Sequence, residues 1–155
     1  FSQGSVLNLV GQGATDDDND GDDDDKEEAA PIDEAAREAD KAAICAELAR
    51  ADLVTAMFVM NELFTDKRQA MKLVQALVAH LRPGAYFLLV DSAGSFSNLK
   101  VGQRTYMIYT IFDALHAYFE PVISEDSEWY RYPKHLNYPL ELNNMRYFIR
   151  LYRRL

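Results

Sequence analysis

Two nearly continuous apolar segments most strongly limit the folds open to this chain. Residues 53–60 read Leu-Val-Thr-Ala-Met-Phe-Val-Met, and residues 85–90 read Ala-Tyr-Phe-Leu-Leu-Val. Each segment has the length of a strand but lacks the alternation of a strand that has one face in water. Parallel strands that are covered on both faces have this pattern. The two segments therefore predict an α/β domain in which both are buried strands.

Segments of helical pattern separate the expected strands. Helices are expected over three segments, namely 32–50, 65–81 and 101–119. Residues 1–10 are expected to contain the end of a strand and the loop after it. Further strands are expected over 51–60, 85–90, 121–132 and 145–152, with a turn at 125–127 inside the segment 121–132. The first helix would open with Pro31, and the second would be capped by Thr65. The alternation predicts a mostly parallel sheet, whereas the last two strands, with no helix between them, should form an antiparallel pair.

The net charge of −9 comes from one segment of the chain. Residues 16–28 contain eight Asp and two Glu against one Lys, so the rest of the chain is neutral. Like charges repel and cannot be buried, which predicts a disordered acidic insert over residues 14–30. It is interpreted as a surface-loop insertion, and the alternative is an acidic lure for basic ribosomal or histone proteins. The acidic composition does not exclude a nucleic-acid partner for the folded part.

Length and composition exclude several classes of protein. The 155 residues suffice for one domain with a core. No apolar run reaches the roughly 18 residues that span a bilayer, so no membrane partner is expected. The single cysteine, Cys45, excludes an internal disulfide, and the three histidines lack metal-ligand spacing, so no metal is expected. These features are typical of an intracellular protein.

Polar residues follow three of the expected strands. They are Gln3-Gly4-Ser5, Met60-Asn61-Glu62 and Asp91-Ser92. The carboxyl ends of parallel strands meet at one edge of a sheet, where ligands bind in such folds. Helix capping is the simpler explanation for any one of these residues. Three aligned strand ends favour a binding or catalytic site.

The C-terminal stretch is basic and aromatic. Residues 129–155 contain six Lys or Arg residues against Glu141 alone, with Trp, Tyr and Phe interleaved. Single-stranded RNA is bound by this combination, since bases stack on rings and phosphates contact cations. The alternative is a strand pair with a packed aromatic face. Trp129, Arg131 and Lys134, expected in a loop near the sheet edge, are the best candidates for RNA contact.

Several of these segments resemble a known family. They are 52–64, 81–84 (Leu-Arg-Pro-Gly), 89–97, 127–131 and 144–147. In series they resemble the C-terminal two-thirds of a class I S-adenosylmethionine-dependent methyltransferase. More narrowly, they resemble the fungal large-subunit (25S) ribosomal RNA uridine-N3 methyltransferases. The resemblance covers residues 1–10 and 50–155.

The resemblance implies a Rossmann-like sheet whose N-terminal strands are missing, so that residues 1–155 form a partial methyltransferase domain. Without the first strand, residues 53–59 would be an unpaired apolar edge. We therefore expect this chain alone to bind the cofactor S-adenosyl-L-methionine poorly and to aggregate. The implied reaction is methylation of uridine N3 in ribosomal RNA, with a pre-ribosomal particle as a further partner and a nuclear, nucleolar location.

The resemblance also implies roles for individual residues. Cofactor contacts would come from the loops after two strands, through Ser5, Val6, Phe58, Met60 and Asn61. Glu62 and Asp91 are the candidates for the base that removes the N3 proton. Substrate contacts would come from Ser92, Trp129, Arg131 and Lys134. The alternatives are a non-catalytic interaction module on the same fold, or a methyltransferase that acts on protein or a small molecule.

Overall fold

The computed structural model describes residues 34–94, 98–101, 103–136 and 138–155. Its elements in chain order are α1 (Glu34–Arg50), β1 (Leu53–Met57), α2 (Met60–Leu63), α3 (Lys67–His80), β2 (Tyr86–Ser92), β3 (Asn98–Val101), β4 (Arg104–Met107), α4 (Tyr109–Asp113), β5 (Phe119–Tyr130) and β6 (Met145–Arg154). The expected strand end and loop at 1–10, the acidic insert at 14–30 and the first residues of the first expected helix lie outside the described residues.

The main sheet has four strands in the order β1-β2-β6-β5. Strand β1 is parallel to β2, whereas β6 is antiparallel to both β2 and β5. Strands β1, β2 and β5 therefore run in one direction, with β6 inserted against them. The α/β class and the antiparallel C-terminal pair are confirmed. The sheet is less parallel than expected, because β6 separates the two strands that would otherwise be parallel neighbours.

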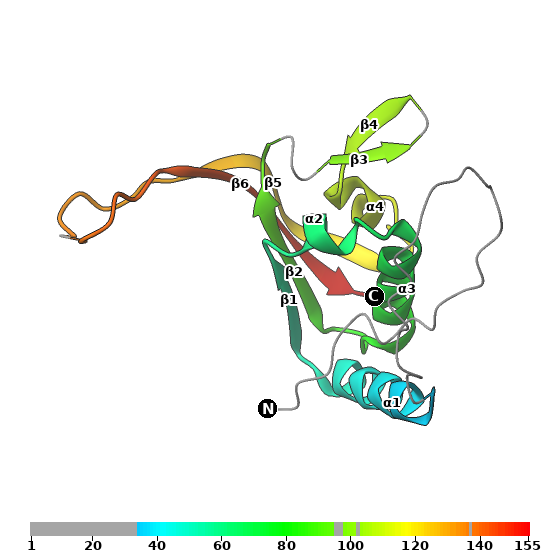
Figure 1. Cartoon of the computed structure of the whole chain (residues 1–155). Coiled ribbons are helices and arrows are strands. Elements are labelled where there is room, and N and C mark those ends of the chain that lie inside the picture. Colours follow the sequence, from blue (N-terminus) through cyan, green and yellow to red (C-terminus); the bar gives the residue numbers. More distant parts are fainter. Residues whose placement is uncertain (1–33, 95–97, 102, 137) are drawn as a thin grey trace, which may run out of the picture.

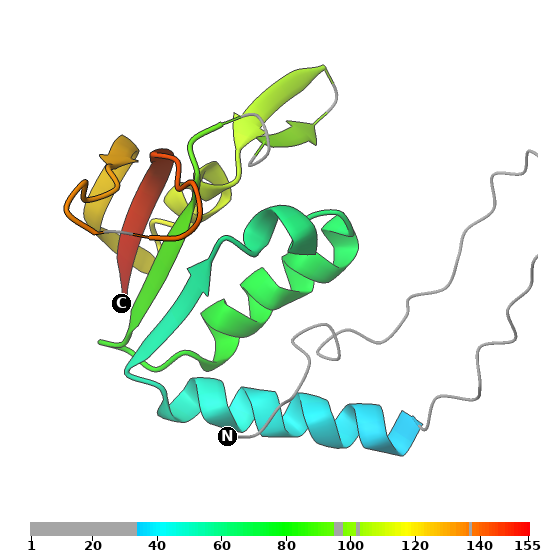
Figure 2. The same ribbon diagram turned by 60° about the vertical axis from the view of Figure 1, so that its left-hand side comes forward.

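The described helices lie on one side of this sheet, and Figures 1 and 2 show the other side without a described helix. Phe87 of β2 and Tyr152 of β6 point to the covered side, where Phe87 lies 4.9 Å from the ring of Phe112 in α4. Leu53 and Met57 of β1 point to the other side and are exposed. The packed core therefore occupies one face of the described sheet.

The helix expected over residues 101–119 is wrong. Residues 98–107 form the two-stranded β3–β4 hairpin, and α4 spans only Tyr109–Asp113. The register pairs Val101 with Arg104, so the connection has two residues, and its sequence Gly-Gln is typical of such hairpins. The apolar spacing suggested one long helix. Its later apolar residues Ile108, Phe112 and Phe119 are buried, but only Phe112 lies within α4.

Two further boundaries differ from expectation. The turn expected at 125–127 is a register shift within one long strand, β5, between Glu125 and Glu128. A bulge of this kind absorbs extra residues and bends the strand without ending it. Strand β1 ends at Met57, three residues earlier than expected, because the chain turns sharply at Phe58. In the described part of the chain, no helix is long and apolar enough to cross a membrane.

Asp66, and not the expected Thr65, caps helix α3. The Asp66 carboxylate accepts a hydrogen bond from the backbone N–H of Gln69 at 3.1 Å. Asp and Thr can both satisfy a free N–H of the first turn. The prediction from the sequence was one residue too early, because Thr and Asp are both good capping residues.

Replacing Asp66 with Ala is expected to lower the free energy of unfolding by about 1 kcal/mol, since the cap of α3 would be lost. Thr65→Ala is the matched control and should change it by less than about 0.5 kcal/mol. Urea unfolding followed by circular dichroism measures both. An equal loss in the two variants would contradict the assignment of the cap.

Candidate functional site

The carboxyl ends of β1 and β2 lie side by side. The register pairs Met57 with Val90, and the N–H of Phe58 donates to the carbonyl oxygen of Val90 at 2.9 Å. Asn61 and Glu62 come after β1, and Asp91 and Ser92 are the last two residues of β2. These polar residues therefore come from adjacent segments at one edge of the sheet, as expected. The third polar group, which contains Ser5, and its neighbour Val6 lie outside the described residues.

Phe58 has a strained backbone at this edge. Its φ is +55°, and it alone among the described non-glycine residues has a positive φ. Such a conformation is an outlier for a bulky side chain, costs about 1–3 kcal/mol and is typical of functional sites. The Phe58 side chain is exposed. The strain thus turns the chain from β1 into α2 and leaves an aromatic ring at the edge.

The three residues that follow differ in accessibility. The Met60 side chain is fully buried in the core, so it contributes packing to this edge. The Asn61 side-chain oxygen accepts from the N–H of Glu62 at 2.9 Å, which orders the start of α2. The Glu62 side chain is exposed. Of the predicted residues after β1, Glu62 is therefore the one whose charged group is open to a ligand.

A shallow hollow of about 300 Å³ lies beside Glu62 at the α2–α3 turn. It is lined by Glu62, Leu63, Thr65, Asp66 and Gln69. The Gln69 Oε1 atom is buried and has no hydrogen-bond partner among the described residues. The lining thus includes carboxylates and an amide oxygen, which suit a ligand that donates hydrogen bonds. Sequence reasoning missed Gln69, since a single Gln on a helix carries no signal.

Asp91 is only 2% exposed. Its Oδ1 atom accepts from the N–H of Ser92 at 2.7 Å. The alternation of β2 places it on the same face as Phe87 and Leu89, at the end of the core. Burial of a carboxylate is costly unless it is hydrogen-bonded. Asp91 is therefore suited to holding the loop after β2 in place, and it is less accessible than Glu62.

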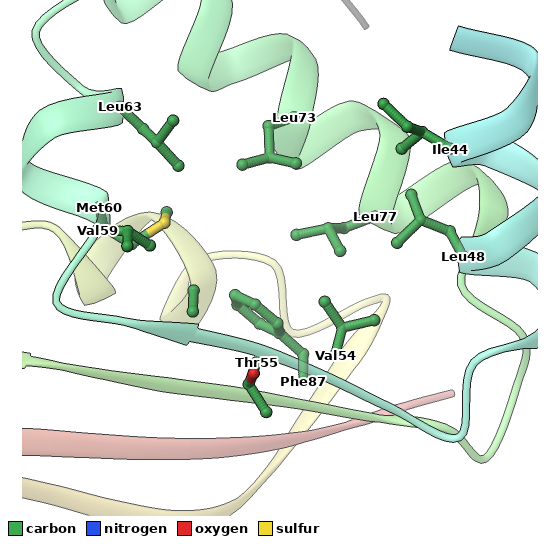
Figure 3. A pocket seen from close by; sticks show the side chains of 11 residues that line it. Ile44, Leu48, Val54, Thr55, Val59, Met60, Leu63, Leu73, Leu77 and Phe87 are labelled. Atoms are coloured by element: carbon green, nitrogen blue, oxygen red, sulfur yellow. The ribbon is translucent and has the colours of Figure 1, made fainter. Parts of the chain in front are cut away.

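An apolar cavity of about 130 Å³ lies on the helix side of β1. Figure 3 shows its lining from α1 (Ile44, Leu48), β1 (Val54, Thr55), α3 (Leu73, Leu77) and Phe87. Thr55 alone among these has a polar side chain, and it points away from the cavity to the exposed face of the sheet. Ligand sites need a few convergent polar groups to orient a ligand. This cavity has no charged lining group, so it does not suit a charged cofactor.

Strands β5 and β6 extend past the sheet as a two-stranded ribbon, and Figure 1 shows it projecting to the left. Residues 128–147, which comprise this ribbon and its connecting segment, are called the arm below. Trp129 lies on the arm opposite Arg146. Arg131 and Lys134 lie in the connecting segment, and both are exposed. The three predicted substrate residues therefore belong to one element that projects from the sheet.

Four of the six basic residues in the C-terminal stretch have structural partners, and one of them is Arg146, whose Nη2 donates to the carbonyl oxygen of Ala93 at 2.9 Å. Arg150 pairs with Asp113 and Asp126, and Arg153 Nε donates to Glu120 at 2.9 Å. Arg154 donates to the carbonyl oxygen of Val78 at 2.9 Å. The excess of positive charge read from the sequence therefore overstates the charge available to RNA. Arg131 and Lys134 are the exposed basic residues that remain available on the arm.

Arg150 is the centre of a network that joins α4 to the base of the arm. Its guanidinium lies 3.9 Å from the ring centre of Tyr109, and its Nε lies 3.5 Å from Asp113 Oδ1. The Tyr152 hydroxyl donates to the same Asp113 oxygen at 2.7 Å. Burial, and then this hydrogen bond, raise the pKa of Tyr152 well above its ordinary value. The one sign of this network in the sequence is the alternation of β6, which places Arg150 on the same face as the buried residues Phe148 and Tyr152.

No group of three His, Cys, Asp or Glu residues within the described ranges could hold a metal ion. The predicted site residues after β1 and β2 form a polar edge in this part of the molecule. The described geometry offers an exposed carboxylate, a strained aromatic residue and a buried carboxylate that orders a loop.

Comparison with known proteins gives two matches. The model of a family described as "putative SAM-dependent methyltransferase" matches residues 32–153. The "25S rRNA (uridine(2843)-N(3))-methyltransferase" of Saccharomyces cerevisiae is 35% identical over 112 residues, which cover 65% of this chain and 31% of the yeast protein. The aligned part of the chain thus spans about a third of the length of that relative.

Proposed function

Because the chain belongs to this family of SAM-dependent methyltransferases, we propose that it is part of an enzyme that methylates uridine N3 in large-subunit ribosomal RNA. The proposal of the substrate rests on the yeast relative, whose name gives that reaction. The observation that carries the chemistry is the polar edge itself, where exposed Glu62 follows β1 and buried Asp91 ends β2.

The residues at this edge fit the cofactor, S-adenosyl-L-methionine. When bound, it supplies an electrophilic methyl group attached to a sulfonium cation. The exposed ring of Phe58 suits contact with a cation, and the exposed Glu62 carboxylate suits its hydrogen-bond donors. In this proposal Phe58, Asn61 and the backbone of Met60 hold the cofactor, together with Ser5 and Val6.

Methylation of N3 requires the loss of its proton. A base must lie within hydrogen-bond reach of that proton, so its carboxylate must be accessible. Glu62 meets this condition and is assigned as the proton acceptor, whereas Asp91 positions Ser92 and the loop after β2. The remaining catalysis would come from alignment of the uracil and exclusion of water.

The target uracil must leave its stack before its N3 can reach Glu62. Ser92, at the end of β2, and the arm residues Trp129, Arg131 and Lys134 are the proposed contacts to RNA. A substrate of this kind is consistent with a nucleolar location and with binding to a pre-ribosomal particle.

Two measurements test the proposed function. Calorimetry would measure S-adenosylmethionine binding to this chain and to a version extended upstream. Methyl transfer from labelled cofactor to purified large-subunit RNA would be read as 3-methyluridine after digestion. We expect cofactor binding and 3-methyluridine with the extended chain. Label found only in protein or small molecules would favour another methyltransferase, and no binding by either chain would favour a non-catalytic module.

A further inference from the structure

The arm begins where β2 ends. Ser92 and Tyr147 are the last paired residues of β2 and β6, and the N–H of Ala93 still donates to the carbonyl oxygen of Arg146 at 3.2 Å. Met145 of β6 pairs only with β5, so Tyr130–Met145 is the pair that leaves the four-stranded sheet. Since β1, β2 and β5 run in one direction, the arm extends from the edge that carries the candidate site.

Trp129 lies on β5, and β6 separates it from the loop that follows β2, which is called the site loop below. Directly paired residues of antiparallel strands share a face, with Cβ atoms about 5 Å apart. Trp129 shares its face with Arg146, whose Nη2 donates to the carbonyl oxygen of Ala93 at 2.9 Å. Ala93 follows Ser92 directly. The register thus places Trp129 next to Arg146, and Arg146 is the residue that contacts the loop after β2.

The rings of the arm are open to solvent. Trp129 is 54% exposed and Tyr138 is 61% exposed, and Tyr130 is also more than half exposed. A two-stranded ribbon gains little stability in water from its own side chains. Large apolar groups exposed together on such an element mark a binding surface.

The charges of the arm favour a polyanion only modestly. Arg131 and Lys134 are exposed and make no hydrogen bond or ion pair with the residues that the structure describes. Glu128 and Glu141 lie on the same arm and offset part of this charge. Stacking on the rings must therefore supply most of the affinity, with two phosphate contacts added to it.

We propose that the arm binds single-stranded RNA beside the target uridine, with a base stacked on Trp129 and with Arg131 and Lys134 on phosphates. The choice of RNA rests on the proposed function. The arm would hold the strand next to the site loop and so determine which nucleotide reaches Glu62. Arg146 acts as a positioning residue, because it joins the Trp129 face of the arm to Ala93.

The experiment uses the fluorescence of Trp129, which is the single tryptophan of the chain. The whole chain is titrated with an oligouridylate of about ten nucleotides, without cofactor. We expect saturable quenching by the stacked base. The logarithm of the binding constant should fall with the logarithm of salt concentration with a slope of about −1.4, as expected for two phosphate contacts to a single strand.

Variants separate stacking from general attraction, with binding read from the anisotropy of a labelled oligouridylate. Trp129→Ala should bind on the order of tenfold more weakly, whereas Trp129→Phe should retain most of the affinity. Tyr86→Ala is the matched control, since Tyr86 is an exposed ring at the opposite end of β2, and it should bind like the parent chain.

Two results would overturn the proposal. One is equal RNA affinity of the parent chain and Trp129→Ala. The other is Trp129 emission that does not respond to RNA but changes with the concentration of the chain, which would show that a second copy of the chain covers the arm. Neither depends on methyl transfer, so failure of the arm proposal is distinguishable from failure of the proposed function.

Discussion

Glu62→Gln is expected to lower kcat for uridine methylation by about 100- to 10,000-fold, which is the usual contribution of a general base. The substitution keeps the size of the side chain and one acceptor oxygen but removes its ability to take the N3 proton. Because the Glu62 side chain is exposed, the free energy of unfolding should change by less than about 0.5 kcal/mol. Rate measurements with the extended chain under saturating cofactor test this result.

The pH profile distinguishes a base from a merely structural residue. A base must be deprotonated to act, so the rate of the parent enzyme should rise with pH. Glu62→Gln should lose this rise. Glu47→Gln, which changes an exposed residue of α1, is the matched control and should keep both the rate and the rise.

Asp91→Asn should have a different effect. Its carboxylate orders Ser92, so the substitution should weaken RNA binding or cofactor binding and lower stability, with the rise in the pH profile retained. If Asp91→Asn abolished the rise while Glu62→Gln kept it, the roles of the two residues would be exchanged. Burial thus distinguishes the accessible carboxylate of Glu62 from the buried one of Asp91, which the sequence could not rank.

The strands of the sheet were predictable because burial leaves a strong local pattern. The apolar segments at 53–60 and 85–90 contain β1 and β2, and the last expected strand coincides with the start of β6. The hairpin at 98–107 was not predicted, because its apolar residues continue into a helix and so mimic a helical period. The Gly-Gln pair at 102–103 was the available signal for a hairpin.

The family, too, was predictable, and the resemblance drawn from five short segments is confirmed by the match over residues 32–153. The partners of individual charges were not. Arg150, Arg153 and Arg154 look alike in the sequence, yet their roles depend on residues more than twenty positions away. The positive φ of Phe58 likewise follows from tertiary packing around the β1–α2 turn, which no local pattern records.

Arg150→Ala is expected to lower the free energy of unfolding by about 3 kcal/mol. Removing one partner of a buried ion pair costs about 3–5 kcal/mol. The lower end applies here, because Arg150 is 5% exposed but the Asp126 side chain is 71% exposed and would be hydrated once its partner is gone. The contact between the guanidinium and the Tyr109 ring would also be lost.

Arg153→Ala is the matched control for this prediction. Arg153 lies three residues further along β6 and pairs with Glu120, but both side chains are 47% exposed. Exposed ion pairs contribute about 0–1 kcal/mol, so this variant should lose less than about 1 kcal/mol. Urea unfolding of both variants gives the comparison. An equal loss would mean that the Arg150 network contributes no more than a surface pair.

The Arg150 variant also tests how the arm is held. Asp126 lies within the register shift between Glu125 and Glu128, directly before the arm, and Arg150 connects it to α4 through Asp113. Without Arg150, the base of the arm should move more freely relative to the sheet. The anisotropy of Trp129 emission should then fall in Arg150→Ala under conditions where the chain is still folded, and stay unchanged in Arg153→Ala. Unchanged anisotropy in both would mean that strand pairing alone orients the arm.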